Sequence, residues 1–235
     1  MPRLALAALA ALLTLAVGPA APASTQSGPK PWHLKSASQF RLPAPPAASS
    51  GTTRAELREL MRLQRRRSPA MRAAISRWNG RPAVIPWTEA ALRMIVDHRP
   101  RPPFSARALA MLETGMYDAL LAAKDSRAAY AKQTRPSPGV REPRLKPLLR
   151  VTGSTYAAQE AAIAGAAEQI LTYLFPNEPP RTFRALADEA VNSRLWAGAN
   201  YRSDVTRARA LGQRVAEQVL ERAKADGSTS IVTSH

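Results

Sequence analysis

The chain has 235 residues, and its 34 Lys and Arg outnumber 17 Asp and Glu, which gives a formal charge of +17. It has no Cys, so disulfides, thiolate metal sites and cysteine nucleophiles are excluded. Only 6% of the residues are aromatic and Ala is frequent, a composition that argues against a β-sandwich or β-barrel. The three histidines, His33, His98 and His235, leave few His-based mechanisms open.

Residues 1–23 have the pattern of a secretory signal peptide. Arg3 gives a short basic start, residues 4–17 form an apolar run, and Ala21-Pro22-Ala23 offers small residues for cleavage. The apolar run is shorter than the roughly 20 residues that cross a bilayer, although an uncleaved anchor is the alternative. We therefore expect an exported protein of the bacterial periplasm, with a mature chain from Ser24 and no transmembrane helix after cleavage.

Residues 24–52 are rich in Ser, Pro and Ala and show no hydrophobic periodicity. This composition predicts a flexible or draped N-terminal arm. At the other end, residues 228–235 are expected to form a disordered tail. The folded domain is therefore predicted to span residues 53–227.

Helical patterns fill that domain. Thr53 to Glu56 reads as a capping box, and Ser68-Pro69 reads as an N-cap followed by Pro at the first helical position. Apolar residues at three- to four-residue spacing predict the later helices. These are 88–97, 105–123, a helix from 154 or 155 to 174, 181–197, and a last helix capped by Ser203 and ended by Gly227. A basic, Pro-rich loop is expected over 132–151, and the fold class is all-α.

Three stretches resemble one known set of motifs. The clearest runs from Ser193-Arg194 to Asp204, with Asn200 between them. It resembles the third motif of the vanadium-dependent haloperoxidase and type 2 phosphatidic acid phosphatase superfamily, which is Ser-Arg, five residues, His, three residues, Asp. The second motif, Pro-Ser-Gly-His or a variant, falls on residues 157–160, and the first, Lys, six residues, Arg-Pro, falls on residues 128–136. The resemblance covers about residues 53–227 and implies a helical bundle of the haloperoxidase and phosphatidic acid phosphatase type.

The family's site binds a tetrahedral oxyanion, phosphate or vanadate. A Lys and two Arg neutralise the anion, and the forked guanidinium suits its oxygens. One His attacks phosphorus or ligates vanadium, and an Asp orients that ring. A second His acts as acid or base. By this resemblance, Arg135, Ser193 and Arg194 are the candidate anion-binding residues, and Asp204 matches the orienting Asp.

Four positions depart from the family pattern. Asn200 replaces the nucleophilic His, and an amide nitrogen has no free lone pair with which to attack phosphorus or ligate vanadium. Glu160 replaces the acid–base His, where a carboxylate repels a dianion and attracts arginine. Ala128 lacks the motif's lysine, and Ala158 lacks its hydroxyl. Loss of a nucleophile alone costs several orders of magnitude in rate.

We therefore predict a degenerate oxyanion site in a binding or structural protein. No residue is assigned as catalytic beyond the family positions Glu160, Asn200 and Asp204. Three interpretations remain open: an internal salt-bridge cluster with Arg135 and Arg194, an anion-binding site without chemistry, and a weak phosphatase or haloperoxidase-like enzyme with a rewired site. We expect no metal and no cofactor, and vanadate or phosphate would bind only in a functional site.

The excess of positive charge suggests other partners. Arg65, Arg66 and Arg67 form a basic run, and the loop residues Arg141, Arg144, Lys146 and Arg150 add a second group. No aromatic residues interleave with these cations and no nucleic-acid motif accompanies them, which argues against nucleic acid. The charge is either a solvated basic face or a surface for an anionic part of the cell envelope or a periplasmic protein.

Overall fold

The structure is a computed structural model that describes residues 28–225, apart from 134, 152 and 180. All regular secondary structure within these residues is helical, which confirms the all-α prediction. The helices are α1 (Gly51–Arg65), α2 (Pro69–Asn79), α3 (Ile85–His98), α4 (Pro102–Ala129), α5 (Pro138–Arg141), α6 (Gln159–Leu174), α7 (Thr182–Trp196) and α8 (Arg202–Ala225). The predicted signal peptide, the tail and Gly227 lie outside the described residues.

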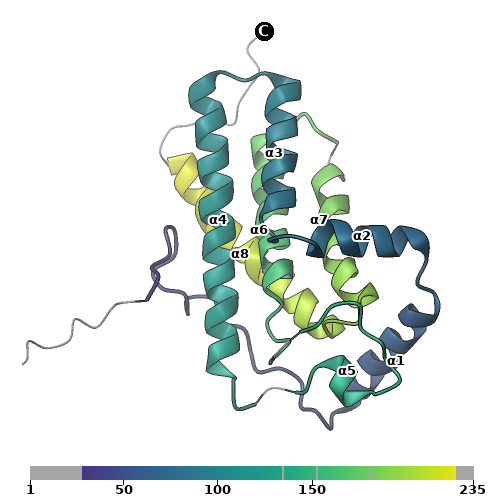
Figure 1. The fold of residues 1–235 in the computed structure, drawn as a ribbon. Coiled ribbons are helices and arrows are strands. Elements are labelled where there is room, and N and C mark those ends of the chain that lie inside the picture. Colours follow the sequence, from purple (N-terminus) through teal and green to yellow (C-terminus); the bar gives the residue numbers. More distant parts are fainter. Residues whose placement is uncertain (1–27, 134, 152, 180, 226–235) are drawn as a thin grey trace, which may run out of the picture.

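Helix α6 lies at the centre of the bundle and contacts α3, α4, α7 and α8 (Figure 1). Helices α1 and α5 gather at the end of the bundle where the long helix α4 finishes (Figure 1). Helix α6 is apolar on nearly all sides, as expected for a helix surrounded by others. None of the described helices is both long and apolar enough to cross a membrane.

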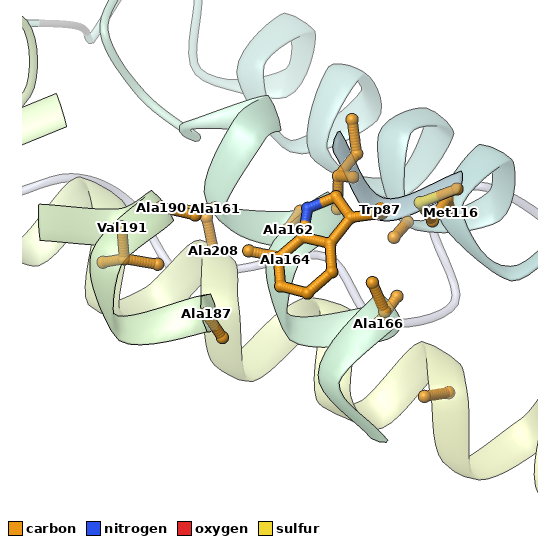
Figure 2. Close-up of a cluster of buried hydrophobic side chains, with 14 of the residues drawn as sticks. Trp87, Met116, Ala161, Ala162, Ala164, Ala166, Ala187, Ala190, Val191 and Ala208 are labelled. Carbon is orange, nitrogen blue, oxygen red and sulfur yellow. The ribbon is translucent and has the colours of Figure 1, made fainter. Parts of the chain in front are cut away.

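Small side chains allow the helices to approach closely. Figure 2 shows alanines of α6, α7 and α8 packed around Trp87 of α3 and Met116 of α4. At the crossing of α6 and α8 even alanine is too large: a Cβ on Gly165 would lie 2.1 Å from the Arg209 carbonyl oxygen, and one on Gly212 would lie 1.9 Å from that of Ala162. The two backbones therefore touch, and this contact fixes where the first turns of α6 and α8 lie.

Several predicted helix starts are corrected by the structure. Helix α3 begins at Ile85 and not at residue 88, and helix α4 begins at Pro102 and not at residue 105. Helix α6 begins at Gln159 and not at Ser154 or Thr155, because residues 154–158 are not helical and Ala158 is the N-cap. Helix α8 begins at Arg202, so Ser203 lies inside its first turn and is not the cap.

The predicted capping box is corrected as well. Ser50 caps α1 by accepting a hydrogen bond from the Thr53 amide. Glu56 instead accepts a 2.7 Å hydrogen bond from the backbone amide of Ser203, so it satisfies a donor at the start of α8. The tertiary contact therefore replaces the local one that the sequence pattern suggested.

Residues 28–50, predicted as a flexible or draped arm, contain no regular helix and lie against α4 and α8. The buried carboxylate of Asp118 on α4 accepts hydrogen bonds from the backbone amides of Trp32, at 2.8 Å, and His33, at 2.7 Å. Further along, the Leu42 amide donates to Ser126 Oγ at 3.1 Å, and the Leu34 and Leu42 side chains are buried. The arm is thus held by specific contacts to the body.

We expect Asp118→Ala to destabilise the protein by about 1–3 kcal/mol and to expose the arm to proteolysis, because two amides of the arm lose their acceptor. Denaturant unfolding and limited proteolysis measure the two effects. Asp125→Ala is the comparison for burial, since Asp125 lies on the same helix and also binds the arm, but through the exposed Arg41 at the surface. Equal losses of stability in the two variants would contradict the anchoring role of Asp118.

Candidate functional site

The six predicted site residues converge at the bundle end where α6 and α8 begin and α7 finishes. Glu160 and Asp204 lie in the first turns of α6 and α8, and Ser193 and Arg194 lie in the last turn of α7. Asn200 comes from the α7–α8 loop and Arg135 from the loop after α4. Acidic residues are favoured at helix N-termini by the partial positive charge there, so the positions of Glu160 and Asp204 fit the helix dipoles.

Arg135 is buried and its two terminal nitrogens each have two acceptors. Nη1 donates to Thr53 Oγ1 at 2.8 Å and to Glu56 Oε2 at 2.6 Å. Nη2 donates to Ser203 Oγ at 2.6 Å and to Asp204 Oδ1 at 3.1 Å. The guanidinium also lies over the Tyr201 ring, with Cζ 3.6 Å from the ring centroid, a favourable cation–π contact. Arg135 therefore joins α1 to α8 with its charge neutralised internally.

Arg194 forms the second half of the site. Its Nε donates to Asn200 Oδ1 at 2.9 Å, and its Nη1 donates to Asn79 Oδ1 at 2.8 Å. The same Nη1 lies 3.1 Å from Glu160 Oε1 and forms an ion pair with it. Ser193 hydrogen-bonds to Asn79, and its own hydroxyl donates to the Ala190 carbonyl. The predicted contact between Glu160 and Arg194 is present.

Thr155 links the two halves. Its hydroxyl donates to Asp204 Oδ2 at 2.6 Å, and its carbonyl accepts from the Asn200 amide nitrogen at 2.8 Å. Asp204 therefore bonds to Thr155 and Arg135. In the family pattern this Asp would orient the His ring, but here it does not bond to Asn200, which occupies the position of that His. Both ends of the Asn200 amide are occupied, one by Arg194 and the other by Thr155.

Burial governs the proton affinities at the site. It raises the pKa of Asp204, against the opposing effects of Arg135 and of the hydrogen bonds from Thr155 and Arg135. It lowers the pKa of Arg194, against the nearby charge of Glu160. Both shifts express the cost of charge in a poorly solvated place, which is why these groups need close partners.

Arg127 is a site residue that the sequence motifs did not indicate. It donates from Nε to the Tyr156 carbonyl at 2.9 Å and from Nη2 to the Ala157 carbonyl at 3.1 Å, so it holds the segment that precedes α6. Burial lowers the pKa of Arg127, and the opposing charges of Glu160 and Asp204 only partly offset this effect. The one sequence signal that could have identified Arg127 is its position next to Ala128, where the family pattern has Lys.

With Arg127, the site contains three guanidinium groups and three carboxylates, those of Glu56, Glu160 and Asp204. Glu56 and Asn79 also lie outside the three motifs, and the sequence pattern around each is that of a residue at a helix end. The two described histidines bond elsewhere, His33 to Thr114 and His98 to Glu178. Within residues 28–225, no group of three His, Cys, Asp or Glu is arranged to hold a metal ion.

A pocket of about 600 Å³ opens beside Arg135. Its polar lining includes Lys124, Arg127 and Ser154, and Ala128 lies on its wall. Arg127 and Arg135 therefore line an opening, although the Arg135 side chain is almost fully buried.

Comparison with known proteins agrees with this architecture. Residues 148–227, which hold α6, α7 and α8, match the family model of the VCPO second helical-bundle domain. The fold is similar to the crystal structure of the first bacterial vanadium-dependent iodoperoxidase, with a TM-score of 0.67 and 21% sequence identity. That match covers 80% of this chain and 54% of the iodoperoxidase, so the chain spans about half of its relative.

A second similar structure is the transmembrane PAP2-type phosphatidylglycerolphosphate phosphatase from Bacillus subtilis. It has a TM-score of 0.51 and 13% identity, over 80% of this chain and 91% of the phosphatase. No curated protein matches the sequence. The comparisons thus confirm the predicted fold type and, over residues 148–227, a likeness to a VCPO helical-bundle domain.

We expect Arg135→Met to destabilise the protein by about 3–5 kcal/mol, because it leaves Glu56 and Asp204 buried without their partner. Arg144→Met is the control, since Arg144 pairs with Glu142 but its side chain is 79% exposed. Urea unfolding of both variants measures the difference. A loss for Arg135→Met as small as that for Arg144→Met would show that the buried ion pairs do not hold α1 to α8.

Proposed function

We propose, from the match of residues 148–227 to a VCPO second helical-bundle domain, that the chain is a non-catalytic member of the haloperoxidase and phosphatase superfamily. In this proposal the oxyanion site is degenerate, and its arginines serve a binding or structural role. The observation that carries the proposal is the ion pair between Arg194 Nη1 and Glu160 Oε1 at 3.1 Å. A carboxylate of the chain itself takes the place of an external anion.

The hydrogen bonds of the cluster support the same conclusion. An incoming phosphate or vanadate would compete with Glu160 for Arg194, and with Glu56 and Asp204 for Arg135. The three carboxylates balance the charge of the three guanidinium groups, so the site offers no net positive charge to a phosphate anion. The buried position of Arg135 adds the cost of separating an ion pair that water does not reach.

Asn200 is the chemical reason for proposing that turnover is lost. Its amide nitrogen donates to the Thr155 carbonyl and its oxygen accepts from Arg194. In this geometry the side chain acts as a bridge between the α6 and α7 ends of the site. It offers no lone pair on nitrogen for a phospho-enzyme bond or a vanadium ligand.

The alternative is a weak phosphatase or haloperoxidase-like enzyme with a rewired site. One observation favours it: the pocket of about 600 Å³ beside the cluster, lined by Lys124 and Arg127. An oxyanion that entered this pocket would meet two cations not counted among the family's motifs. Such an anion would still lack a nucleophilic histidine, because His33 and His98 bond outside the site.

We expect wild-type protein to bind vanadate weakly and to show neither phosphomonoesterase nor halide-peroxidising activity. Glu160→Gln should raise vanadate affinity about tenfold to a hundredfold, because a charge-assisted hydrogen bond that competes for Arg194 contributes about 1.5–3 kcal/mol. Calorimetric titration with vanadate measures this change. Glu178→Gln is the matched control, since its carboxylate pairs with His98 away from the site.

A double variant separates binding from chemistry. Glu160→His with Asn200→His restores both family histidines, and we expect it to gain vanadate affinity before it gains turnover, because Ala128 still lacks the motif's lysine. Tight stoichiometric binding of vanadate by wild-type protein would contradict the proposal. Wild-type turnover that disappears in Arg194→Ala would contradict it as well.

The same proposal includes export to the periplasm, supported by the signal pattern of residues 1–23. We expect the protein in periplasmic fractions to begin near Ser24, which N-terminal sequencing or intact-mass measurement determines. Full-length chain confined to the cytoplasm would rule out export.

A further inference from the structure

The outer face of α1 carries a row of arginines that the site does not use. Arg54, Arg58, Arg62 and Arg65 follow one another at intervals of four, four and three residues, so they share one side of the helix. All four are exposed, whereas Thr53, Glu56 and Leu60 on the other side are buried. One helix therefore faces the ion-pair cluster with one side and presents four cations to solvent with the other.

This row borders a groove of about 440 Å³ between α1 and the loop after α5. The four arginines line it together with Arg144, while Leu57 and Met61 supply apolar surface. Glu142 is the groove's only carboxylate, and both of its oxygens already accept hydrogen bonds from Arg144, at 2.8 and 2.9 Å. In the described part of the chain, Arg58, Arg62 and Arg65 form no ion pair.

The loop that forms the far wall is tied firmly to α1. Gln64 donates from Nε2 to the Arg144 carbonyl at 3.1 Å and accepts from the Lys146 amide at 2.5 Å. Arg67, just after α1, donates a long hydrogen bond from Nη1 to the Lys146 carbonyl of the same loop, at 3.5 Å. The cations of the loop are thus held next to those of α1, and we call the whole surface the α1 basic groove.

We infer that the α1 basic groove is a docking surface for an anionic phospholipid bilayer. Guanidinium groups suit phosphate oxygens, and cations within a Debye length of a charged surface add their attractions. Leu57 and Met61 give the groove apolar surface next to the cations, a combination typical of segments that lie at a membrane interface. No aromatic side chain lines the groove, so it lacks the stacking platform of a single-stranded nucleic-acid site. Helix α1 lies at one end of the bundle (Figure 1), and its four arginines are exposed.

The test uses the full chain and vesicles of two compositions, pure phosphatidylcholine and an equimolar mixture with phosphatidylglycerol. We expect binding that depends on phosphatidylglycerol and weakens with added salt. Arg58→Gln with Arg62→Gln should weaken binding to the anionic vesicles roughly 25-fold, at about fivefold for each cation removed. Binding through the apolar N-terminal run would instead be similar for both lipid compositions.

The control removes the same charge at the other end of the bundle. Arg101 precedes α4 and Arg184 lies in the first turn of α7, and Figure 1 places the starts of both helices away from α1. Arg101→Gln with Arg184→Gln should therefore weaken vesicle binding several-fold less than the α1 pair. Equal losses in the two double variants would overturn the inference. The inference would also be overturned if wild-type protein did not bind anionic vesicles, or if it bound polyglutamate or single-stranded DNA but not the vesicles.

Discussion

The two terminal nitrogens of Arg135 bond to acceptors that the chain itself supplies, and the arrangement of the site depends on this. A buried guanidinium is stable only when its donors meet acceptors of good geometry. The terminal nitrogens of Arg135 bond to Glu56 from α1 and Asp204 from α8, which lie far apart in the sequence, whereas its buried Nε has no hydrogen-bond partner among the described residues. The same Glu56 carboxylate satisfies the Ser203 amide at the start of α8. Moving any one of these groups would leave another buried charge or donor without a partner.

The bundle brings these groups together through the close packing of α6 and α8. Gly165 and Gly212 let the two backbones touch, so the helices cross where no side chain separates them. Their first turns carry Glu160 and Asp204, which take positions that helix dipoles favour for carboxylates. In a site built to hold a phosphate or vanadate, the same helix starts would offer positive potential to the external anion. In our proposal the two acidic side chains use that potential themselves.

The sequence predicted much of this, because the decisive signals were local. Three- to four-residue spacing located the long helices, and the Ser193-Arg194 to Asp204 motif located four of the site residues. The failures arose where a tertiary contact overrode a local pattern. Glu56 fitted a capping box, yet it bonds to Arg135 and Ser203 across the bundle.

Other features had no local signal at all. Asn79 looked like the end of a helix, and only the fold shows that it accepts a hydrogen bond from Arg194. Asp118 lies inside a continuous helical pattern, and nothing around it indicates that its carboxylate holds two amides of the N-terminal arm. Arg127 is adjacent in the sequence to Ala128, which occupies the motif's lysine position. In each case the partner is at least 29 residues away in the sequence, beyond the reach of spacing arguments.

The central claim is that the chain's own carboxylates occupy the arginines that would otherwise hold an oxyanion. A crystal structure of the wild-type protein soaked in vanadate tests it most directly. We predict that Glu160 remains paired with Arg194, that Arg135 keeps its bonds to Glu56 and Asp204, and that no tetrahedral density appears between the two arginines. Density for vanadate bound to Arg194 and Arg135, with Glu160 displaced, would contradict the account.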